Sequence, residues 1–419
     1  MGTVEMLAER FRSTISPELL KTRRFWAAIS ALTRAQFGPA RKNPDAAALQ
    51  QTIDNTRDAF LGHGPVAWAS LLIPTELLHG AGVVGFYPEV AAAVLTTGRF
   101  SERFLQRASA DGFSSDLCSF HRVVLGASAE GFLPRPDVIL SASSPCDSAP
   151  MSFAHLADFH GVEHIALEFP ACEPTSGGTG ILARQIADTF ERLLEMEGTG
   201  SEAKLRSVVE LSNEAGAYAR EVEELRRLSP CPLDGWDALG QLAVIHTLPG
   251  TRECVEFYRL LADELRRGKA NRAPERQDHR LLWMHLKPYF ATSMPRFLEE
   301  KGAVIVCEEY NRWFWPEMDP GRPFDSMAVK MMSHPAVGPA SRRAEIMIRL
   351  AREYRVDGAV HFSHRGCRQS SGCARQLRDE LAAAGIRTLV LDGECLDERE
   401  HNEGQVRTRL EAFLESLDG

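Results

Sequence analysis

The sequence predicts an α/β protein with two doubly wound parallel sheets, a helical N-terminal extension and a helical linker region. Short runs of β-forming residues alternate with helical segments over residues 63–180, and the same alternation returns over residues 281–419. Between them lies a long stretch dominated by Glu, Arg, Leu and Ala. Strands that alternate with helices across short links are typical of parallel sheets covered by helices.

Residues 1–62 are expected to form the helical extension. Apolar residues recur there at three-and-four spacing with charges between them, as in Phe25-Trp-Ala-Ala-Ile-Ser-Ala-Leu32. Pro74 then opens a short helix through Leu78, since proline lacks the N–H that a first helical residue leaves unused. Gly80-Ala-Gly82 ends this helix and leads into the strand Val83-Val-Gly-Phe86.

The first α/β domain, residues 63–180, is expected to continue with a helix from Ser101 and another at Cys118. Its remaining elements are the strand Val138 to Ser141, the helix Met151 to Phe159 and the strand His164 to Phe169. Gly177-Gly-Thr-Gly180 is interpreted as a turn, because no Gly-Lys-Ser/Thr follows it as in a phosphate-binding loop.

The helical region and linker are placed at residues 181–280, where the pattern is helical from Leu182 to about Arg267 and polar from Lys269 to Arg280. The second α/β domain, residues 281–419, resembles a further copy of the first design. Its expected elements are the strands Leu281 to Leu286, Ala303 to Val306, Gly358 to Phe362 and Thr388 to Leu391, and helices from Pro295, around Met327 and Arg343, from Cys367 to Ala384 and from Gln405 to Leu417.

The net charge and the distribution of basic residues argue against two classes of binding partner. The 419 residues carry a formal net charge of −9, and Lys and Arg form no long run, so neither nucleic acid nor an anionic membrane surface is an expected partner. The N-terminus has no secretory pattern, and no apolar stretch is long enough to cross a bilayer. Nine cysteines, an odd number, fit a reducing compartment better than a disulfide framework. A cytoplasmic protein with thiols available for metal is expected.

Three stretches place a cysteine next to a strand or at the start of a helix. They are Leu117-Cys-Ser-Phe-His-Arg-Val-Val-Leu-Gly126, Val138-Ile-Leu-Ser-Ala-Ser-Ser-Pro-Cys-Asp-Ser148 and His361-Phe-Ser-His-Arg-Gly-Cys-Arg-Gln-Ser-Ser-Gly-Cys373. The cysteines are too far apart in sequence for a local metal motif, so only the fold could assemble them. Cys146 and Cys367 follow strands, where α/β sheets form their sites, and the helix start at Cys118 would favour a thiolate.

In their order and spacing these stretches resemble the 2-hydroxyacyl-CoA dehydratase and benzoyl-CoA reductase family, in particular subunits of the 2-hydroxyglutaryl-CoA dehydratase D-component type. The resemblance extends from about Pro74 to the C-terminus and includes Pro74-Thr-Glu-Leu-Leu-His-Gly-Ala-Gly82 and Cys307-Glu-Glu-Tyr-Asn-Arg-Trp-Phe-Trp315. It implies sheets of the Rossmann or flavodoxin type, and a 4Fe-4S cluster held by Cys118, Cys146 and Cys367 with one iron left open as a Lewis acid.

A dehydration also needs residues that handle protons. His364, Glu76, His79 and His121 are the candidates, and His364 is the first choice because a turn at the end of its strand delivers it next to Cys367. A polar residue beside a metal ligand more often caps a helix, and Asp147 has the pattern of such a cap. Cysteines without a motif are expected to be core or surface thiols, namely Cys172, Cys231, Cys254 and Cys395. The role of Cys307 stays open, and Cys373 is expected to pack in the core, with support of the cluster or replacement of a ligand as alternatives.

The function implied by the resemblance is loss of water from a 2-hydroxyacyl-CoA through a ketyl radical. It implies a homologous subunit as partner, or a second copy of this chain, and a separate ATP-dependent activator as electron donor. Three alternatives stay open: an aromatic-CoA reductase subunit of the benzoyl-CoA type, a homodimeric double-cubane cluster reductase, and a cluster-bearing electron carrier or cluster-less scaffold subunit.

Overall fold

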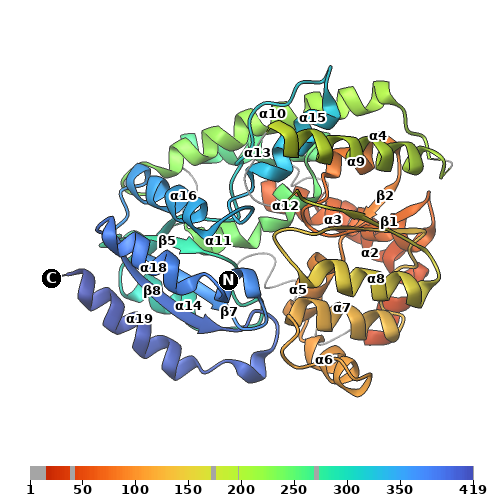
Figure 1. Ribbon diagram of the computed structural model, residues 1–419. Coiled ribbons are helices and arrows are strands. Elements are labelled where there is room, and N and C mark those ends of the chain that lie inside the picture. The colour runs from red at the N-terminus through yellow and green to blue at the C-terminus, as the bar shows by residue number, and fades with distance from the viewer. Residues whose placement is uncertain (1–15, 38–42, 171–175, 197, 269–272, 419) are drawn as a thin grey trace.

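Two four-stranded sheets, both entirely parallel, form the centre of the protein, in a computed structural model that describes residues 16–37, 43–170, 176–196, 198–268 and 273–418. In the first sheet the strand order is β2-β1-β3-β4, and in the second it is β6-β5-β7-β8. The two orders are equivalent, so the expected duplication of the design is confirmed, as is the α/β class. Figure 1 shows the two sheets side by side with helices around them.

The first sheet consists of β1 (Val66–Ala69), β2 (Val84–Phe86), β3 (Val138–Ala142) and β4 (Glu163–Leu167). Its helices are α4 (Thr75–Ala81), α5 (Pro88–Thr97), α6 (Ser101–Ala110), α7 (Ser119–Ala129) and α8 (Ser148–His160). Strand β1 was not predicted. It is four residues long, too short for a periodic signal, and it is defined by its pairing with β2 and β3 on either side.

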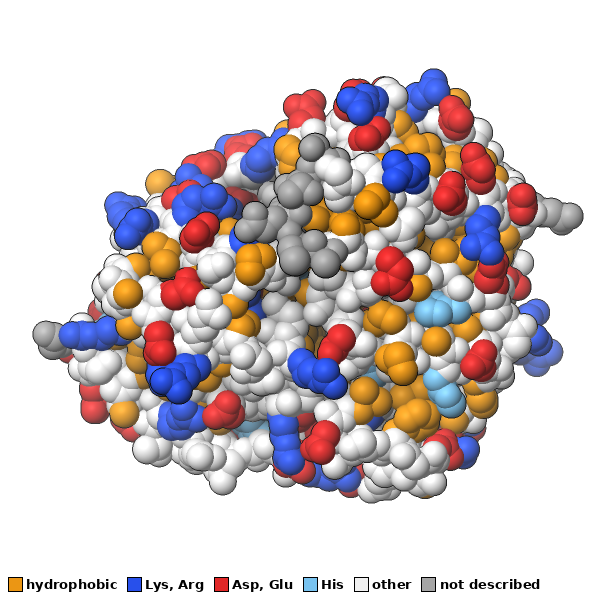
Figure 2. Space-filling model, viewed as in Figure 1, with side chains coloured by type: hydrophobic (Ala, Val, Ile, Leu, Met, Phe, Trp, Pro, Cys, Tyr) orange, Lys and Arg blue, Asp and Glu red, His pale blue; other side chains and the backbone are white. Residues whose placement is uncertain are grey.

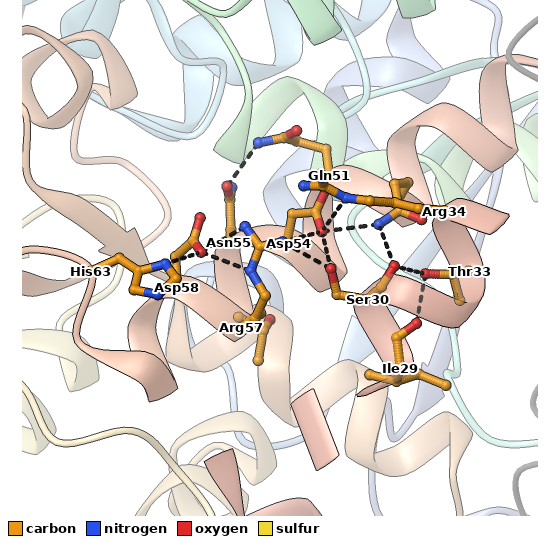
Figure 3. Close-up of polar contacts among 12 residues, drawn as sticks. Ile29, Ser30, Thr33, Arg34, Gln51, Asp54, Asn55, Arg57, Asp58 and His63 are labelled. Atoms are coloured by element: carbon orange, nitrogen blue, oxygen red, sulfur yellow. Dashed lines mark hydrogen bonds and ion pairs between the residues drawn. The ribbon is translucent and has the colours of Figure 1, made fainter. Parts of the chain in front are cut away.

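The N-terminal helices α2 (Arg23–Phe37) and α3 (Pro44–Leu61) pack as a hairpin beside the first sheet, preceded by η1 (Pro17–Lys21). The expected helical extension is therefore confirmed for its described part, and residues 1–15 lie outside the described residues. Inside the hairpin the buried carboxylate of Asp54 accepts hydrogen bonds from Ser30 (2.6 Å) and Gln50 (2.9 Å) and pairs with Arg34 and Arg57 (Figure 3).

Replacing Asp54 with alanine is expected to lower the free energy of unfolding by about 2–4 kcal/mol, because several buried donors would lose their acceptor. Chemical denaturation followed by circular dichroism measures this. The matched control is Asp111→Ala, which removes a surface pair with Arg107 and should change stability by less than about 0.5 kcal/mol. Equal losses in the two variants would show that the Asp54 network contributes nothing beyond a surface pair.

A layer of helices joins the two sheets: α9 (Ser176–Leu194), α10 (Glu202–Arg226), α11 (Gly235–Gly240), α12 (Leu242–Thr247) and α13 (Arg252–Arg266). The prediction that residues 177–180 form a loop turn is wrong, because these residues are helical and lie at the start of α9. Leu182, Ile186, Phe190 and Leu193 are fully buried at helical spacing, and α9 packs along α15. This tertiary packing outweighs the low helix propensity of three glycines.

The second sheet contains β5 (His279–Met284), β6 (Ala303–Glu308), β7 (Gly358–His364) and β8 (Arg387–Gly393). Around it lie α14 (Met294–Glu300), α15 (Pro323–Ser333), α16 (Ala340–Glu353), α17 (Arg368–Ser371), α18 (Ala374–Ala383), η3 (Glu398–Glu400) and α19 (Glu403–Leu417). The single helix expected from Cys367 to Ala384 is wrong, since it divides into α17 and α18 at Gly372 and Cys373.

One hydrophobic cluster runs through both sheets. It contains Trp68 and Ile139 of the first sheet together with Trp283 and Phe362 of the second. A shared core holds the two sheets in a fixed relative position, so a site can be built from both. On the face shown in Figure 2, acidic and basic side chains are interspersed. None of the helices in the described ranges is long and apolar enough to cross a membrane.

Candidate metal centre and its surroundings

The three cysteines singled out in the sequence lie at the starts of three helices. Cys118 is the N-cap of α7, Cys146 lies in the loop between β3 and α8, and Cys367 is the N-cap of α17 directly after β7. In each sheet the second strand is added on one side of the first strand and the third on the other side, so the strand order switches between β1 and β3 and between β5 and β7. Such switch points leave a crevice at the carboxyl ends of the strands, where α/β proteins bind ligands.

Backbone N–H groups lower the pKa of each of the three thiols, against the larger effect of burial. They belong to Phe120 for Cys118, to Ser148 and Ala149 for Cys146, and to Gln369 and Ser370 for Cys367. These are the unpaired N–H groups at the start of each helix, and they favour negative charge on sulfur. The local folding at all three positions therefore suits a thiolate ligand.

The three thiols are also close to one another. Burial is the main cause that raises their pKa values, and Cys367 and Cys146 raise the pKa of Cys118 further, while Cys367 contributes to raising that of Cys146 to about 12. Without a cation these thiols stay protonated at neutral pH. Among the described residues no His, Cys, Asp or Glu side chains are grouped closely enough for a single metal ion. A cubane cluster needs a wider set, with sulfurs about 7 Å apart.

Contacts between the two sheets bring the cysteine loops together. Gly366 lies against the backbone of Cys118, so close that a Cβ atom there would be 2.6 Å from the Cα of Cys118. Only glycine fits this approach. Asp147 is at the N-cap position of α8 as expected, but its side chain does not cap the helix, and it forms an ion pair with Arg368 instead (2.9 Å).

Two of the four candidate proton-handling residues lie against these thiols. Nε2 of His364 is 3.4 Å from Sγ of Cys118, and Nε2 of His121 is 3.5 Å from Sγ of Cys146. Burial lowers the pKa of both histidines, that of His121 to about 4, so both are neutral at pH 7. Nδ1 of His364 lies 3.3 Å from the Glu394 carboxylate without the angle of a hydrogen bond, and Glu394 also accepts from Ser119.

The other two candidates lie in a different set of contacts. Both carboxylate oxygens of Glu76 are 2.8 Å from Nζ of Lys330, and Ser212 donates to one of them (2.6 Å). This buried ion pair joins α4 to α15, and the Ser212 hydrogen bond joins α4 to α10. Burial lowers the pKa of the neighbouring His79, whose Nε2 has no partner among the described residues. The contacts of Glu76 are those of a structural ion pair.

Glu89, at the start of α5, was missed in the sequence. Burial raises the pKa of its carboxyl to about 8, Oε2 has no hydrogen-bond partner among the described residues, and its charge raises the pKa of Cys146. Its carboxyl therefore keeps a proton at neutral pH, within electrostatic reach of Cys146. In the sequence it follows Pro88 at a helix start, where an acidic residue indicates only a favourable interaction with the helix dipole.

Two further features near Cys367 carried no sequence signal. Cys395, expected to be an unrelated thiol, is fully buried and lies close enough to Cys118 and Cys367 for their charges to raise its pKa. Arg343, also fully buried, forms a two-bond ion pair with Glu309 and donates to Gln369 and to Sγ of Cys373 (3.2 Å). Cys373 thus hydrogen-bonds within the loop of Cys367.

The expectation for Cys231 and Cys254 is confirmed, and Cys307, whose role the sequence left open, is a core thiol as well. Cys231, Cys254 and Cys307 are buried within hydrophobic clusters, as core thiols are. Cys172 lies outside the described residues.

Comparison with known proteins agrees with this architecture. The family model described as 2-hydroxyglutaryl-CoA dehydratase, D-component, matches residues 71–417. The chain belongs to this family. The matched segment of the D-component family includes the three cysteines, Glu89, the joining helices and every strand of the two sheets except β1, and it leaves out the N-terminal hairpin. The resemblance stated from the sequence is thereby confirmed.

Curated relatives of this D-component protein come from dehydratases and from a reductase. The (R)-phenyllactyl-CoA dehydratase alpha subunit of Clostridium sporogenes is 27% identical, with 84% of this chain and 89% of the relative covered. The (R)-2-hydroxyglutaryl-CoA dehydratase alpha subunit of Acidaminococcus fermentans is 20% identical over 91% of this chain and 98% of the relative. One of the subunits of the Thauera aromatica benzoyl-CoA reductase is 22% identical over 82% of this chain and 86% of the relative.

Proposed function

We propose that this chain is the subunit of a 2-hydroxyacyl-CoA dehydratase in which Cys118, Cys146 and Cys367 hold a 4Fe-4S cluster. The observation that supports the proposal is the convergence of three thiols from separate loops of two sheets, with Cys118 buried and Cys146 and Cys367 half-buried, each with its pKa lowered in part by backbone N–H groups. The dehydratase alpha subunits among the relatives support the choice of reaction. A homologous partner subunit and a separate ATP-dependent activator complete the proposed system.

The donor set suits such a cluster. Thiolates are the ligands of iron–sulfur clusters, and the raised pKa values mean that binding would displace the thiol protons. When bound, the cluster would supply one electron to the thioester, giving a ketyl radical, and an iron without a protein ligand as Lewis acid. All proton transfers then depend on side chains of the protein.

Dehydration removes the hydroxyl group from C2 and a proton from C3 of the substrate, and the products are the 2-enoyl-CoA and water. Glu89 is suited to protonate the departing hydroxyl, because it keeps its proton up to a pH of about 8. His364 is suited to accept the C3 proton, because its pKa is lowered and its imidazole is neutral at pH 7. His364 lies against Cys118, and Glu89, from the other sheet, is near enough to Cys146 to affect its pKa.

Serine substitutions of Cys118, Cys146 or Cys367 test the proposal. Each variant, purified without oxygen, is expected to lose most of its bound iron and sulfide and all dehydration while its melting temperature stays near that of the wild type, because the core is built from the sheets. The matched control is Cys254→Ser, a buried thiol in another part of the core. Retention of iron in all three variants would refute the cluster.

Cys395→Ser belongs in the same experiment. If Cys395 were a fourth ligand, its loss would also lower bound iron, and the chain would relay electrons and leave substrate to its partner. Loss of iron with turnover intact in the other variants would likewise make the partner the catalytic subunit. Unchanged iron in Cys395→Ser is expected, which leaves one iron open to substrate.

The similarity to a benzoyl-CoA reductase favours an aromatic acyl-CoA reductase as the second candidate. The two reactions differ in their use of electrons, since dehydration returns the electron and ring reduction consumes it. The ratio of reductant oxidised to product formed therefore separates the candidates. A ratio far below one with a 2-hydroxyacyl-CoA supports the dehydratase, and a stoichiometric ratio with an aromatic acyl-CoA supports the reductase.

A further inference from the structure

His285 directly follows β5 and has an unusual backbone conformation. Its φ angle is +72°, in the left-handed region that residues with a Cβ atom seldom adopt. Among the described residues two others that are not glycine share this feature, Arg99 and Arg355. Both are exposed and follow the ends of helices, where the left-handed conformation is ordinary. His285 is 3% exposed and follows a strand.

The surrounding structure holds this conformation in place. The backbone N–H of His285 donates to Oε2 of Glu309 (3.0 Å), and the Glu309 carboxylate is itself held by Arg343. On the other side, Nε1 of Trp283 donates to the carbonyl oxygen of Leu286 (2.8 Å). Both hydrogen bonds hold backbone atoms of this turn through the side chains of Glu309 and Trp283. Neither bond involves the imidazole ring of His285.

Among the described residues the ring of His285 has aromatic neighbours but no hydrogen-bond partner for Nδ1 that would account for a histidine here. Nδ1 is buried and has no hydrogen-bond partner within the described part of the chain. The ring lies parallel to His364 at a centroid distance of 6.1 Å and edge-on to Tyr310 at 5.3 Å. Glycine or asparagine would suit the backbone better. A buried polar atom left unpaired in a strained residue indicates a functional role.

The position of His285 points to the ligand. It lies at the switch point between β5 and β7, and the parallel His364 lies 3.4 Å from the thiol of Cys118. Burial, with His364 and Arg343 nearby, holds the pKa of His285 well below its usual range, so the ring is neutral. A neutral imidazole offers one N–H donor that does not give up its proton.

We infer that His285 contacts the substrate, with its ring N–H donating a hydrogen bond to the thioester carbonyl oxygen of the bound acyl-CoA. The inference rests on the proposed function. The carbonyl oxygen is the atom on which negative charge develops when the thioester accepts an electron, and a fixed, buried N–H donor stabilises such charge. His285 acts there by hydrogen bonding and transfers no proton.

The experiment compares two ligands and three proteins. The oxygen-free holoenzyme is titrated calorimetrically, without activator, with a 2-hydroxyacyl-CoA and with the thioether analogue in which CH₂ replaces the carbonyl group. Wild type is expected to bind the thioester about ten-fold more tightly, as one hydrogen bond to a buried donor would give. His285→Gly should bind both ligands equally, with unchanged iron and melting temperature. His285→Asn, which suits the left-handed backbone and keeps an N–H donor, should restore part of the preference.

Arg355→Gly is the matched control, since it also removes a side chain from a left-handed position and should keep the full preference. The outcomes are distinguishable. A ten-fold preference retained by His285→Gly, or loss of iron or fold in that variant, overturns the role of His285 and leaves the dehydratase proposal intact. A wild-type complex that neither binds nor dehydrates any 2-hydroxyacyl-CoA overturns the proposed function and this inference with it.

Discussion

Replacing Glu89 with glutamine is expected to lower dehydration by about 10²–10⁴-fold, the loss that follows removal of a general acid. The wild-type rate should fall as pH rises through about 8, where the raised pKa of Glu89 means that its proton is lost. Glutamine cannot donate that proton at any pH. The pH dependence of kcat/KM measures both effects, and the variant's residual rate should lack the decline near pH 8.

The same substitution should stabilise the protein at alkaline pH. The pKa of Glu89 is higher in the folded protein than in the unfolded chain, so the folded state binds the extra proton, and stability falls as pH rises from about 4.5 to about 8. Glutamine removes this loss. Glu89→Gln should therefore exceed wild type in unfolding free energy at pH 8, by an amount on the order of a few kcal/mol.

A matched control for Glu89 is Glu102→Gln. Glu102 is an exposed glutamate in the first turn of α6, in the same helical position but in water. Its substitution should alter neither the rate nor the pH dependence of stability. If Glu89→Gln behaves like this control in turnover, Glu89 is no general acid, and if it behaves so in stability, its carboxyl is not protonated in the folded protein.

Replacing Arg343 with methionine is expected to lower the free energy of unfolding by about 3–5 kcal/mol. It leaves the carboxylate of Glu309 buried without its cation, which is the costly way to break a buried ion pair. It also removes the hydrogen bonds to Gln369 and Cys373 that hold the loop of Cys367, so bound iron should fall as well. Denaturant titration and iron analysis measure the two effects.

The control for Arg343 lies on the same helix. Arg349 pairs loosely with Glu353 at the surface, and Arg349→Met should change stability by less than about 0.5 kcal/mol. The double variant Arg343→Met/Glu309→Gln should lose less than the sum of its single substitutions, because the buried charge is gone. Additive losses would show that the two residues do not stabilise each other, contrary to their bidentate geometry.

The sequence pattern predicted best those elements that are stabilised by interactions between residues close in the chain. Apolar periodicity identified β3, β4 and most elements of the second sheet, because each forms from residues close in the chain. Periodicity did not identify β1, which is a strand because it pairs with β2 and β3. It also gave a turn at the glycines of α9, where burial of Leu182 and Ile186 outweighs the low helix propensity of glycine. Both errors concern contacts between distant segments.

The residue pattern was sufficient to predict the α/β class and, through its resemblance, the family, and it singled out three cysteines as candidate ligands. The contacts of His364 and His121 with those thiols, and the ion pair of Glu76 with Lys330, became visible in the folded structure. The folded structure also shows that burial raises the pKa of Glu89 and that His285 has a left-handed backbone. The physical reason is that pKa values and backbone strain depend on desolvation and on contacts between residues far apart in the chain, which no local pattern encodes.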